Sequence, residues 1–322
     1  MKILHLNLRQ FCCAKQSGWG GTKSPMIGNK SHRRRRFPCG LVLAIYGIFL
    51  IARSNVYGYE WKILQSEHFI IYFTPEEKAA KEILRKAESY YNRIAFDLHY
   101  SRYDGFWTWG NRAKIYIYPD SKSYMRSTGQ PQWSQGAAFY KKRSIVSFAG
   151  NTQFSEDVLP HEMAHLIFRD FIGFKGQIPV WLDEGVAQWE EIPKRKLLQE
   201  KVSKLFEDDS LLVLPEMMRL NIRKVSDNTK LYIKSTVTKE GDPGVIFLSG
   251  DNLVGVYYLQ AFSVVGFLIE KYGSLSFADF CRQLRDGKRL EEALRVAYSS
   301  DIRSINDLEG KWRDYIRDLK GK

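Results

Sequence analysis

Two histidines spaced four residues apart mark the segment His161-Glu162-Met163-Ala164-His165. On an α-helix, residues i and i+4 project from one face about one turn apart, so both imidazoles are able to coordinate one cation. Neutral imidazole is a common zinc ligand, and this spacing is typical of zinc sites. Only four histidines follow Val56, and two of them fall in this pattern. The pattern is therefore hard to obtain by chance.

A third candidate ligand is Glu184, which follows His165 after an 18-residue spacer, inside Trp181-Leu182-Asp183-Glu184-Gly185. A glycine-containing turn in the spacer would fold this glutamate back onto the histidines. Two imidazoles and one carboxylate make a zinc site whose fourth position is left to water, and zinc lowers the pKa of that water to about 7. Glu162 would lie beside the water, where a general base is needed. We expect one Zn²⁺ per chain.

These two segments resemble the metal-binding motifs of the gluzincin peptidases, zinc enzymes whose third ligand is a glutamate. From Trp61 to Leu319 the chain is similar to the compact bacterial peptidase MA-like proteins. The resemblance implies a zinc metallopeptidase in which His161, His165 and Glu184 bind zinc. It also implies that Glu162 takes a proton from the attacking water and delivers it to the leaving amine.

The resemblance further implies a tyrosine or histidine that stabilises the oxyanion. No histidine follows His165, so we select Tyr258, with Tyr257 second, in the tyrosine-rich segment Tyr257–Ser263. The alternative for both tyrosines is packing in an aromatic core. The Gly-Ala-Met-Glu-Asn segment of aminopeptidases is absent from the sequence, which modestly favours an endopeptidase.

Three further features surround the motif. The segment Arg143–Ala149 is predicted to be a strand. In zincins such an edge strand pairs with extended substrate, and the alternative is an ordinary strand within the sheet. Asp183 adjoins the candidate ligand Glu184 and would support the metal site without binding the metal, or else serve as a helix cap or face solvent. Gln188 occupies a position where some zincins have an acidic or hydroxyl partner for a histidine, so the sequence leaves that partner unassigned.

The net charge of +13 is concentrated at the N-terminus. Residues 1–54 hold ten of the 49 Lys and Arg residues and no acidic residue, whereas the rest of the chain has 39 basic and 36 acidic residues. The body is therefore nearly neutral, and a nucleic-acid-binding surface is not supported. Three of the four cysteines also lie in this leader, and the fourth, Cys281, is expected to be a buried inert thiol.

Four arginines, Arg33 to Arg36, precede sixteen almost uninterrupted apolar residues at 37–52. A basic stretch followed by a short apolar run is typical of a secretory signal, with cleavage after Ser54 or Gly58. The run is short for a spanning helix, which needs about 20 residues, but an uncleaved membrane anchor is the alternative. Both readings place the rest of the chain outside the cytoplasmic membrane, periplasmic, secreted or anchored. Translation from Met26 would shorten the leader to a conventional signal.

Early strands and late helices predict an α+β fold, with a zincin-like small mixed sheet, an active-site helix and a helical C-terminal lobe. We expect a leader at 1–58, a catalytic domain at 59–207 and a C-terminal lobe at 208–322 that completes the cleft. Strands are expected within 61–73 and at 113–118 and 143–149. One helix is expected to begin at residue 74 and to end near residue 98, and another is expected to begin at residue 179. Further helices are expected at 156–172, 194–207, 252–272, 277–284, 290–298 and 304–319. Residues 208–250 are expected to be irregular.

Two other functions remain open at this point. One is a catalytically silent protein that keeps the zincin fold and binds envelope partners through its groove. The other is a zinc amidase that acts on cell-wall material. For the peptidase, the partner is a peptide or protein substrate, and the sequence sets neither the cleavage preference nor the oligomeric state.

Overall fold

The computed structural model describes residues 59–74, 76–99, 107–173, 178–225, 230–298 and 301–319. The predicted leader at 1–58 lies outside the described residues, so the signal, the anchor at 37–52 and the location of the protein stay predictions. The described residues from Glu60 onward belong to one compact unit. The domain boundary expected at residue 207 also stays a prediction.

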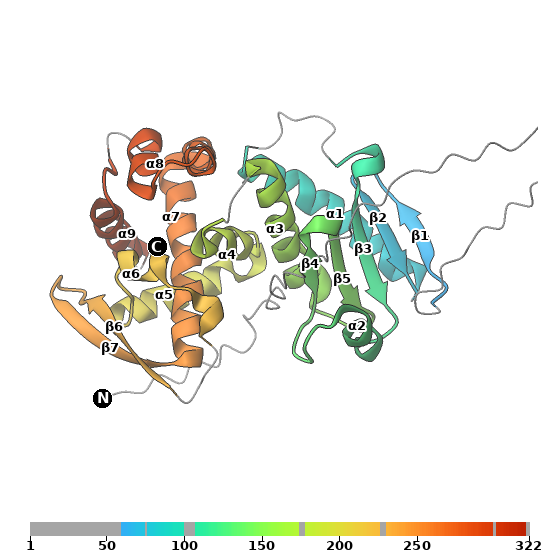
Figure 1. Ribbon diagram of the computed structural model, residues 1–322, viewed down its shortest axis with the longest axis horizontal. Helices are drawn as coiled ribbons and strands as arrows, with labels where there is room; N and C mark the ends of the chain where they lie inside the picture. Colours follow the sequence, from blue (N-terminus) through green and yellow to red (C-terminus); the bar gives the residue numbers. More distant parts are fainter. Residues whose placement is uncertain are drawn as a thin grey trace, which may run out of the picture. The chain divides into compact units, whose positions relative to one another are not determined.

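Five strands form a mixed sheet in the order β1-β2-β3-β5-β4 (Figure 1). Their bounds are Lys62–Gln65 (β1), Phe69–Phe73 (β2), Ala113–Tyr118 (β3), Ala137–Phe139 (β4) and Ser144–Phe148 (β5). Strands β2, β3 and β5 are parallel, and β1 and β4 pair antiparallel with β2 and β5 at the two edges. The parallel pairing aligns Ile71 with Ile115 and Ile115 with Ile145, so apolar side chains on one face lie next to each other.

The strand expected at Arg143–Ala149 is present as β5, but it is not an edge strand. Strand β3 pairs with one side of β5 and β4 pairs with the other, so the backbone of β5 is already engaged on both sides. The expectation that this segment pairs with substrate is therefore wrong. The outer edge belongs to β4, whose three residues are too few to show an alternating pattern in the sequence.

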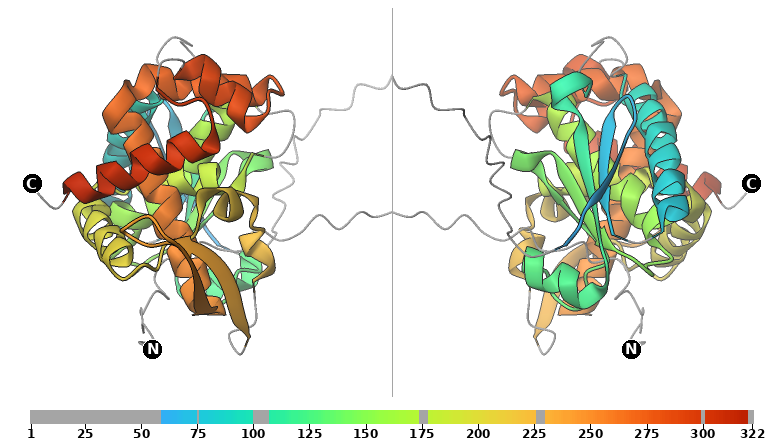
Figure 2. Two further views of the ribbon diagram at one scale, coloured as in Figure 1. Left: turned by 90° about the vertical axis from the view of Figure 1, so that its left-hand side faces the viewer. Right: turned by 90° about the vertical axis from the view of Figure 1, so that its right-hand side faces the viewer.

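Alternation along the strands decides which helices cover which face of the sheet. In β2, Phe69, Ile71 and Phe73 are buried in the main core with helices α1 (Glu77–Asp97) and α3 (Leu159–Ile172). On the opposite face Tyr72 stacks on Tyr116, with ring centroids 4.7 Å apart, and the short helix α2 (Ser121–Thr128) packs against β5 and β3. Figure 2 shows the sheet between these helices.

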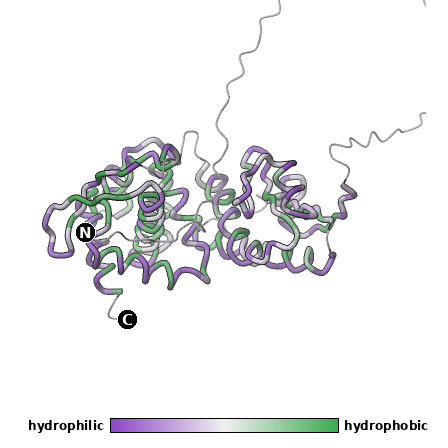
Figure 3. Tube along the Cα trace, turned by 90° about the horizontal axis from the view of Figure 1, so that it is seen from below, coloured by the Kyte–Doolittle hydropathy of each residue, from purple (hydrophilic) through white to green (hydrophobic). Residues whose placement is uncertain are grey.

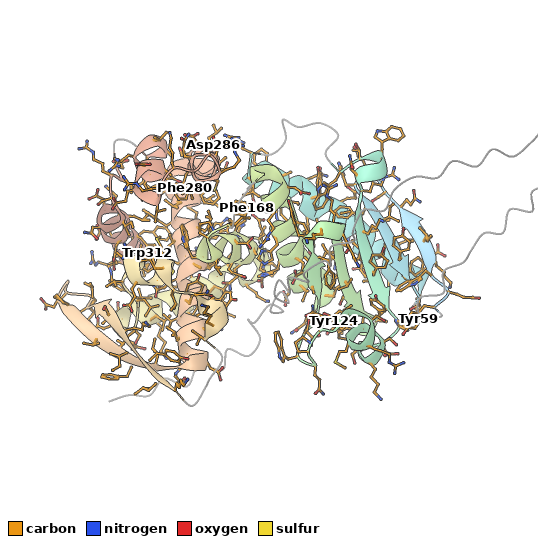
Figure 4. The ribbon with its side chains drawn as sticks, viewed as in Figure 1. Tyr59, Tyr124, Phe168, Phe280, Asp286 and Trp312 are labelled. Carbon is orange, nitrogen blue, oxygen red and sulfur yellow. The ribbon has the colours of Figure 1, made fainter. Side chains whose placement is uncertain are left out.

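The remaining helices gather around one long helix, α7 (Gly250–Arg285). They are α4 (Val180–Trp189), α5 (Arg195–Glu207), α6 (Leu214–Arg219), α8 (Leu290–Ala297) and α9 (Ile305–Leu319). Polar and apolar residues alternate along the helices, as expected for helices that bury one face (Figure 3). Phe168, Phe280 and Trp312, labelled in Figure 4, are among the fully buried side chains.

Helix α7 is long and apolar enough to cross a membrane, and no other helix of the described residues passes that test. The core helix of a soluble protein passes it too, and 83% of the apolar window of α7 is buried. Its helical backbone is interrupted at Gly273, which adopts φ 83°. The sequence predicts a helix end at this glycine, and the structure confirms it.

The expectation that residues 208–250 are irregular is wrong. They contain α6 and an antiparallel hairpin of strands β6 (Leu231–Val237) and β7 (Pro243–Ser249). The chain reverses near Gly241, which has φ 104°, a conformation that glycine adopts without strain. With many helices and a small mixed sheet, the α+β class is confirmed.

Candidate metal centre

Helix α3 carries the two histidines into the interior. Pro160 lies in its first turn, where a missing backbone N–H costs nothing, and Gly173 ends the helix in the left-handed conformation with φ 62°. His161 and His165 are each only 5% exposed. Their rings lie 4.8 Å apart between centroids, on the same face as the i, i+4 spacing predicts.

Helix α4 brings the third residue to the histidines. It begins after Pro179, and every residue from Trp181 to Trp189 is buried. Gly185 lets α4 approach α7 closely, because a Cβ at this position would lie 2.5 Å from the carbonyl oxygen of Ala261 and 2.7 Å from Val265. This close approach fixes the position of the neighbouring Glu184.

The three predicted ligands converge. One ligand atom from each of His161, His165 and Glu184 lies within 4.8 Å of the other two, and all three residues are buried. The distance from His165 Nε2 to Glu184 Oε2 is 3.7 Å. Among the described residues, this is the one group of three or more His, Cys, Asp and Glu side chains close enough together to hold a metal ion.

Two buried carboxylates orient the histidine rings. Asp183 Oδ1 lies 3.0 Å from Nδ1 of His165, and Glu191 Oε1 lies 2.7 Å from Nδ1 of His161. With Nδ1 held by a carboxylate, Nε2 is the nitrogen of each ring that would ligate a metal. Asp183 therefore takes one of the roles considered from the sequence, that of a group that supports the candidate ligands. Glu191 is the histidine partner that the sequence left unassigned.

Each orienting carboxylate is in turn bound by a cation. Arg169 donates from Nη2 to Oδ2 of Asp183 at 2.5 Å, and Lys194 donates to Oε2 of Glu191 at 2.6 Å. Lys194 also lies 3.3 Å from Asp157, at the turn that leads into α3. His165 is thus linked through Asp183 to Arg169 on α3, and His161 is linked through Glu191 and Lys194 to Asp157 before α3.

The electrostatics favour a cation at this position. Burial lowers the pKa of His165, but the carboxylates of Asp183, Glu184 and Glu162 outweigh burial and raise that pKa to about 9. Burial would raise the pKa of Asp183, yet His165 and Arg169 hold it well below its usual range. The same field that favours a protonated imidazole favours a bound divalent cation.

The donor set fits zinc. Two imidazole nitrogens and a carboxylate oxygen are borderline and hard ligands that suit Zn²⁺, and a set of three leaves a position for a reactant. Calcium and magnesium prefer sites made only of oxygen ligands. His161, His165 and Glu184 would hold the ion, with Asp183 and Glu191 behind the two histidines.

Glu162 is adjacent to His161 on α3 and is 4% exposed. Its place in the first turn next to a ligand is where a general base for zinc-assisted hydrolysis is needed. A buried acidic side chain beside a group of candidate metal ligands is a candidate catalytic residue.

Tyr258 lies on α7 and is 8% exposed, and the neighbouring Tyr257 is fully buried. The two rings meet edge to face with centroids 5.7 Å apart. Tyr258, Ala261 and Val265 follow the i, i+3, i+7 stripe of α7, and the last two contact Gly185 of α4. This stripe faces the helix that carries Glu184, but the oxyanion role of Tyr258 stays a prediction.

Gln188 makes no hydrogen bond to either histidine. It is 1% exposed, and neither its amide nitrogen nor its amide oxygen has a hydrogen-bond partner in the described part of the chain. The sequence singled out this position correctly as a departure from an acidic partner. The acidic partner of His161 is instead Glu191, seven residues after Glu184. Lys194, which binds Glu191, follows three residues later.

A separate cavity of about 340 Å³ lies where β2, β3 and β5 end, beside the start of α1. Phe73, Ile117 and Phe154 contribute its apolar walls. None of the three candidate ligands lines it, so the cavity and the metal centre are distinct features of the molecule.

No protein-family model matches the chain, and no curated protein matches it either.

Proposed function

We propose that the protein is a zinc-dependent metallopeptidase of the gluzincin kind. The observation that carries the proposal is the convergence of His161, His165 and Glu184 within 4.8 Å in a buried position. Glu162, buried beside them, gives the site a catalytic group in addition to the ligands.

The arrangement of the sheet supports a zincin-like fold. Helix α3 contacts β4 and β5, so the metal-binding helix lies against the antiparallel edge of the sheet. No strand of the described residues pairs with the outer edge of β4, whereas β5 is paired on both sides. We propose β4, Ala137–Phe139, in place of the segment expected from the sequence, as the strand that aligns the substrate backbone.

In this proposal each side chain of the site has a separate role. When bound, zinc supplies Lewis-acid activation of a water molecule and of the scissile carbonyl. Glu162 accepts the proton of the attacking water and returns it to the leaving amine. Asp183 and Glu191 keep the imidazoles in one orientation, and Tyr258 donates a hydrogen bond to the oxyanion. An endopeptidase is modestly favoured, and the predicted leader would place the reaction outside the cytoplasmic membrane.

The test compares the purified full-length protein with its Glu162→Gln variant. Both are assayed for bound zinc and for cleavage of a mixed peptide library. We expect zinc in both proteins, with cleavage slower in the variant by roughly 10²- to 10⁴-fold, because the general base is lost and the ligands are kept. Glu200→Gln, the same chemical change on an exposed position of α5, is the matched control and should leave cleavage unchanged.

The alternatives predict different results. Zinc in both proteins without cleavage by either would exclude the peptidase and favour a silent binding protein. Release of fragments from purified cell-wall material, with no peptide cleaved, would favour the zinc amidase. Absence of zinc from both proteins would contradict the metal centre itself.

A further inference from the structure

The outer edge of β6 is only partly used within the described structure. Residues 211–213 begin to pair with it: Leu212 forms a bridge with Thr236, and the N–H of Val213 donates to the carbonyl of Ser235 at 3.1 Å. The chain then turns away, because helix α6 starts at Leu214. Figure 1 shows α6 beside the hairpin. A third strand is thus started and not continued.

The geometry of the pairing shows which backbone groups face outward. Ser235 accepts from Val213 and donates its N–H to Glu216 Oε2 at 2.9 Å, so both its backbone groups point away from β7. Backbone groups of alternate residues point to the same edge of a strand. The N–H and C=O of Ile233, two residues earlier, therefore face outward too, and β7 is the only strand among the described residues that pairs along this stretch.

A groove runs along this open edge, between α6 and β6. Its volume is about 460 Å³. Its walls combine the apolar side chains of Val213, Pro215 and Leu220 with the charged side chains of Arg219, Lys234 and Glu216. Lys234 and Glu216 bind each other at 2.9 Å, whereas Arg219 is exposed and makes no ion pair among the described residues.

The outward face of the hairpin is apolar. Leu231, Ile233, Val245 and Phe247 are exposed by 62%, 61%, 61% and 54%. Ile233 is directly opposite Phe247 in the register, so these side chains lie on one face and form a continuous patch. Soluble proteins rarely expose such a patch unless it binds something.

The groove carries a net positive charge. Of the seven residues that line it, Arg219 and Lys234 are basic and Glu216 is acidic, and Glu216 is already paired with Lys234. A partner that lies along this edge would meet apolar side chains on one face of the hairpin and positive charge on the other. It would be attracted if its own charges were negative.

We propose that this edge binds an extended peptide segment in which apolar and acidic residues alternate. The peptide would continue the strand that residues 211–213 begin, with its backbone bonded to Ile233. Residues that extend the face of Ile233 and Leu231 would be apolar. Residues on the opposite face, above the groove that holds Arg219 and Lys234, would be acidic.

A second copy of the chain fits less well. Four half-exposed side chains offer on the order of 400 Å² of contact, about half of what one partner contributes to a typical stable interface. An added strand gains main-chain hydrogen bonds as well as apolar contact, so it needs less area. The inference concerns binding alone and does not depend on the proposed peptidase activity.

The test uses two synthetic octapeptides labelled with fluorescein and titrated with the full-length protein by fluorescence anisotropy. One alternates valine and glutamate, and the other has the same residues in two blocks. We expect the alternating peptide to bind at least tenfold more tightly, because only alternation places each residue type on its matching face. N-methylation of alternate backbone nitrogens should abolish binding, since it removes the main-chain donors.

Two variants test the protein side. Ile233→Pro removes an outward-facing N–H and no bond to β7, and should reduce binding at least tenfold. Arg219→Glu should weaken binding of the valine–glutamate peptide about tenfold and strengthen binding of a valine–lysine peptide. Arg295→Glu, an exposed arginine on α8, is the matched control. If Ile233→Pro fails to fold, the N-methylated peptide tests the same hydrogen bonds.

Three outcomes would overturn the proposal. Equal affinity for the alternating and block peptides would show that composition, and not strand geometry, governs binding. Binding of vesicles of phosphatidylglycerol without binding of either peptide would assign the patch to a membrane surface. Concentration-dependent dimerisation that is lost in Ile233→Pro, without peptide binding, would assign it to a second copy.

Discussion

At the scale of single residues, the candidate metal centre is organised by what lies behind its ligands. Each histidine has its own buried carboxylate, and each carboxylate has its own cation: Asp183 with Arg169, and Glu191 with Lys194. Burying a lone carboxylate is costly, whereas a carboxylate between an imidazole and a cation is stabilised on both sides. The candidate centre is therefore preorganised by side chains that are not among the predicted ligands.

We predict that Asp183→Asn and Glu191→Gln each weaken zinc binding by roughly 10- to 100-fold without removing a ligand, because the amide no longer accepts the imidazole N–H as strongly. Competition with a chromophoric chelator measures the affinity. Asp318→Asn, an exposed change on α9, is the control and should have wild-type affinity. Wild-type affinity in both test variants would show that the rings need no orienting group.

Glu190 makes a second residue-scale prediction. It is 1% exposed, and its Oε2 lies 3.3 Å from Arg93 Nε. Burial, assisted by Asp97, raises its pKa from 4.5 to about 7, although Arg93 and Arg195 oppose the rise. The folded protein thus keeps a proton between about pH 4.5 and pH 7 that the unfolded chain releases, so this group favours folding at low pH. That contribution is lost as pH rises toward and through 7.

Glu190→Gln removes this dependence. The unfolding free energy of the variant minus that of the wild type should therefore increase from pH 5 to pH 8, by up to about 3 kcal/mol. Urea unfolding of both proteins at the two pH values gives the difference, with Glu200→Gln as an exposed control. Parallel pH profiles for wild type and Glu190→Gln would contradict the raised pKa.

How far the sequence predicts this centre depends on how local each signal is. His161 and His165 are predictable because helical periodicity alone places them on one face. Glu191 is not, because it lies beyond the end of α4, where periodicity no longer fixes direction. The family resemblance predicts Tyr258, and its stripe on α7 faces α4. Packing, and not helical periodicity, decides how close its hydroxyl lies to the three candidate ligands.

At the scale of elements, the candidate metal centre depends on how closely α4 approaches α7. Gly185, which follows the buried Glu184, lies against Ala261 of α7. Further along, Trp189 lies against Gly266, where a Cβ would be 2.4 Å from the indole ring. Two glycines, one on each helix, therefore set the separation of the helices and with it the position of the third ligand.

We predict that Gly185→Ala lowers the free energy of unfolding by about 1–3 kcal/mol, because the new methyl group overlaps the backbone of α7 and α4 must shift. It should also weaken zinc binding, since Glu184 moves with α4. Gly310→Ala on α9 meets nothing within 4 Å and is the control. That control should be neutral or stabilising by about 0.5–1 kcal/mol. Denaturant unfolding and zinc titration of both variants measure these effects.

Elements are predicted from sequence where they are long and strongly patterned. Helices α1 and α9 and strand β3 are found close to their true bounds, because their periodicity extends over several turns or a full strand. Strand β4 has three residues, and β6 and β7 lie in a charged, glycine-containing region that resembles a loop in composition. Their pairing comes from contacts with other segments, which no local pattern records.

At the scale of the whole molecule, a metal bound to α3 and α4 would join two parts of the core. Helix α3 packs against α1 and the sheet, and α4 packs against α7. An ion that bridges them stabilises the folded state by an amount that grows with the logarithm of its free concentration, because the unfolded chain lacks the assembled site.

We therefore predict that zinc raises the melting temperature. At a free zinc concentration 1,000-fold above the dissociation constant, the gain is about 4 kcal/mol. For a chain of this size that corresponds to roughly 8–16 °C. Differential scanning fluorimetry with zinc and with a chelator measures the shift, and Glu184→Gln should show little of it. An unchanged melting temperature in the chelator would contradict a structural contribution from the metal.

The ligands, the proposed base and both orienting carboxylates all lie between His161 and Glu191, a stretch of about thirty residues. Closing a loop of this size costs little conformational entropy compared with assembling the sheet or seating α7 on α4. Glu184 nevertheless reaches its place only once α4 has packed on α7, so an ion would bind after the core has formed. Zinc would then slow unfolding and leave the rate of folding unchanged.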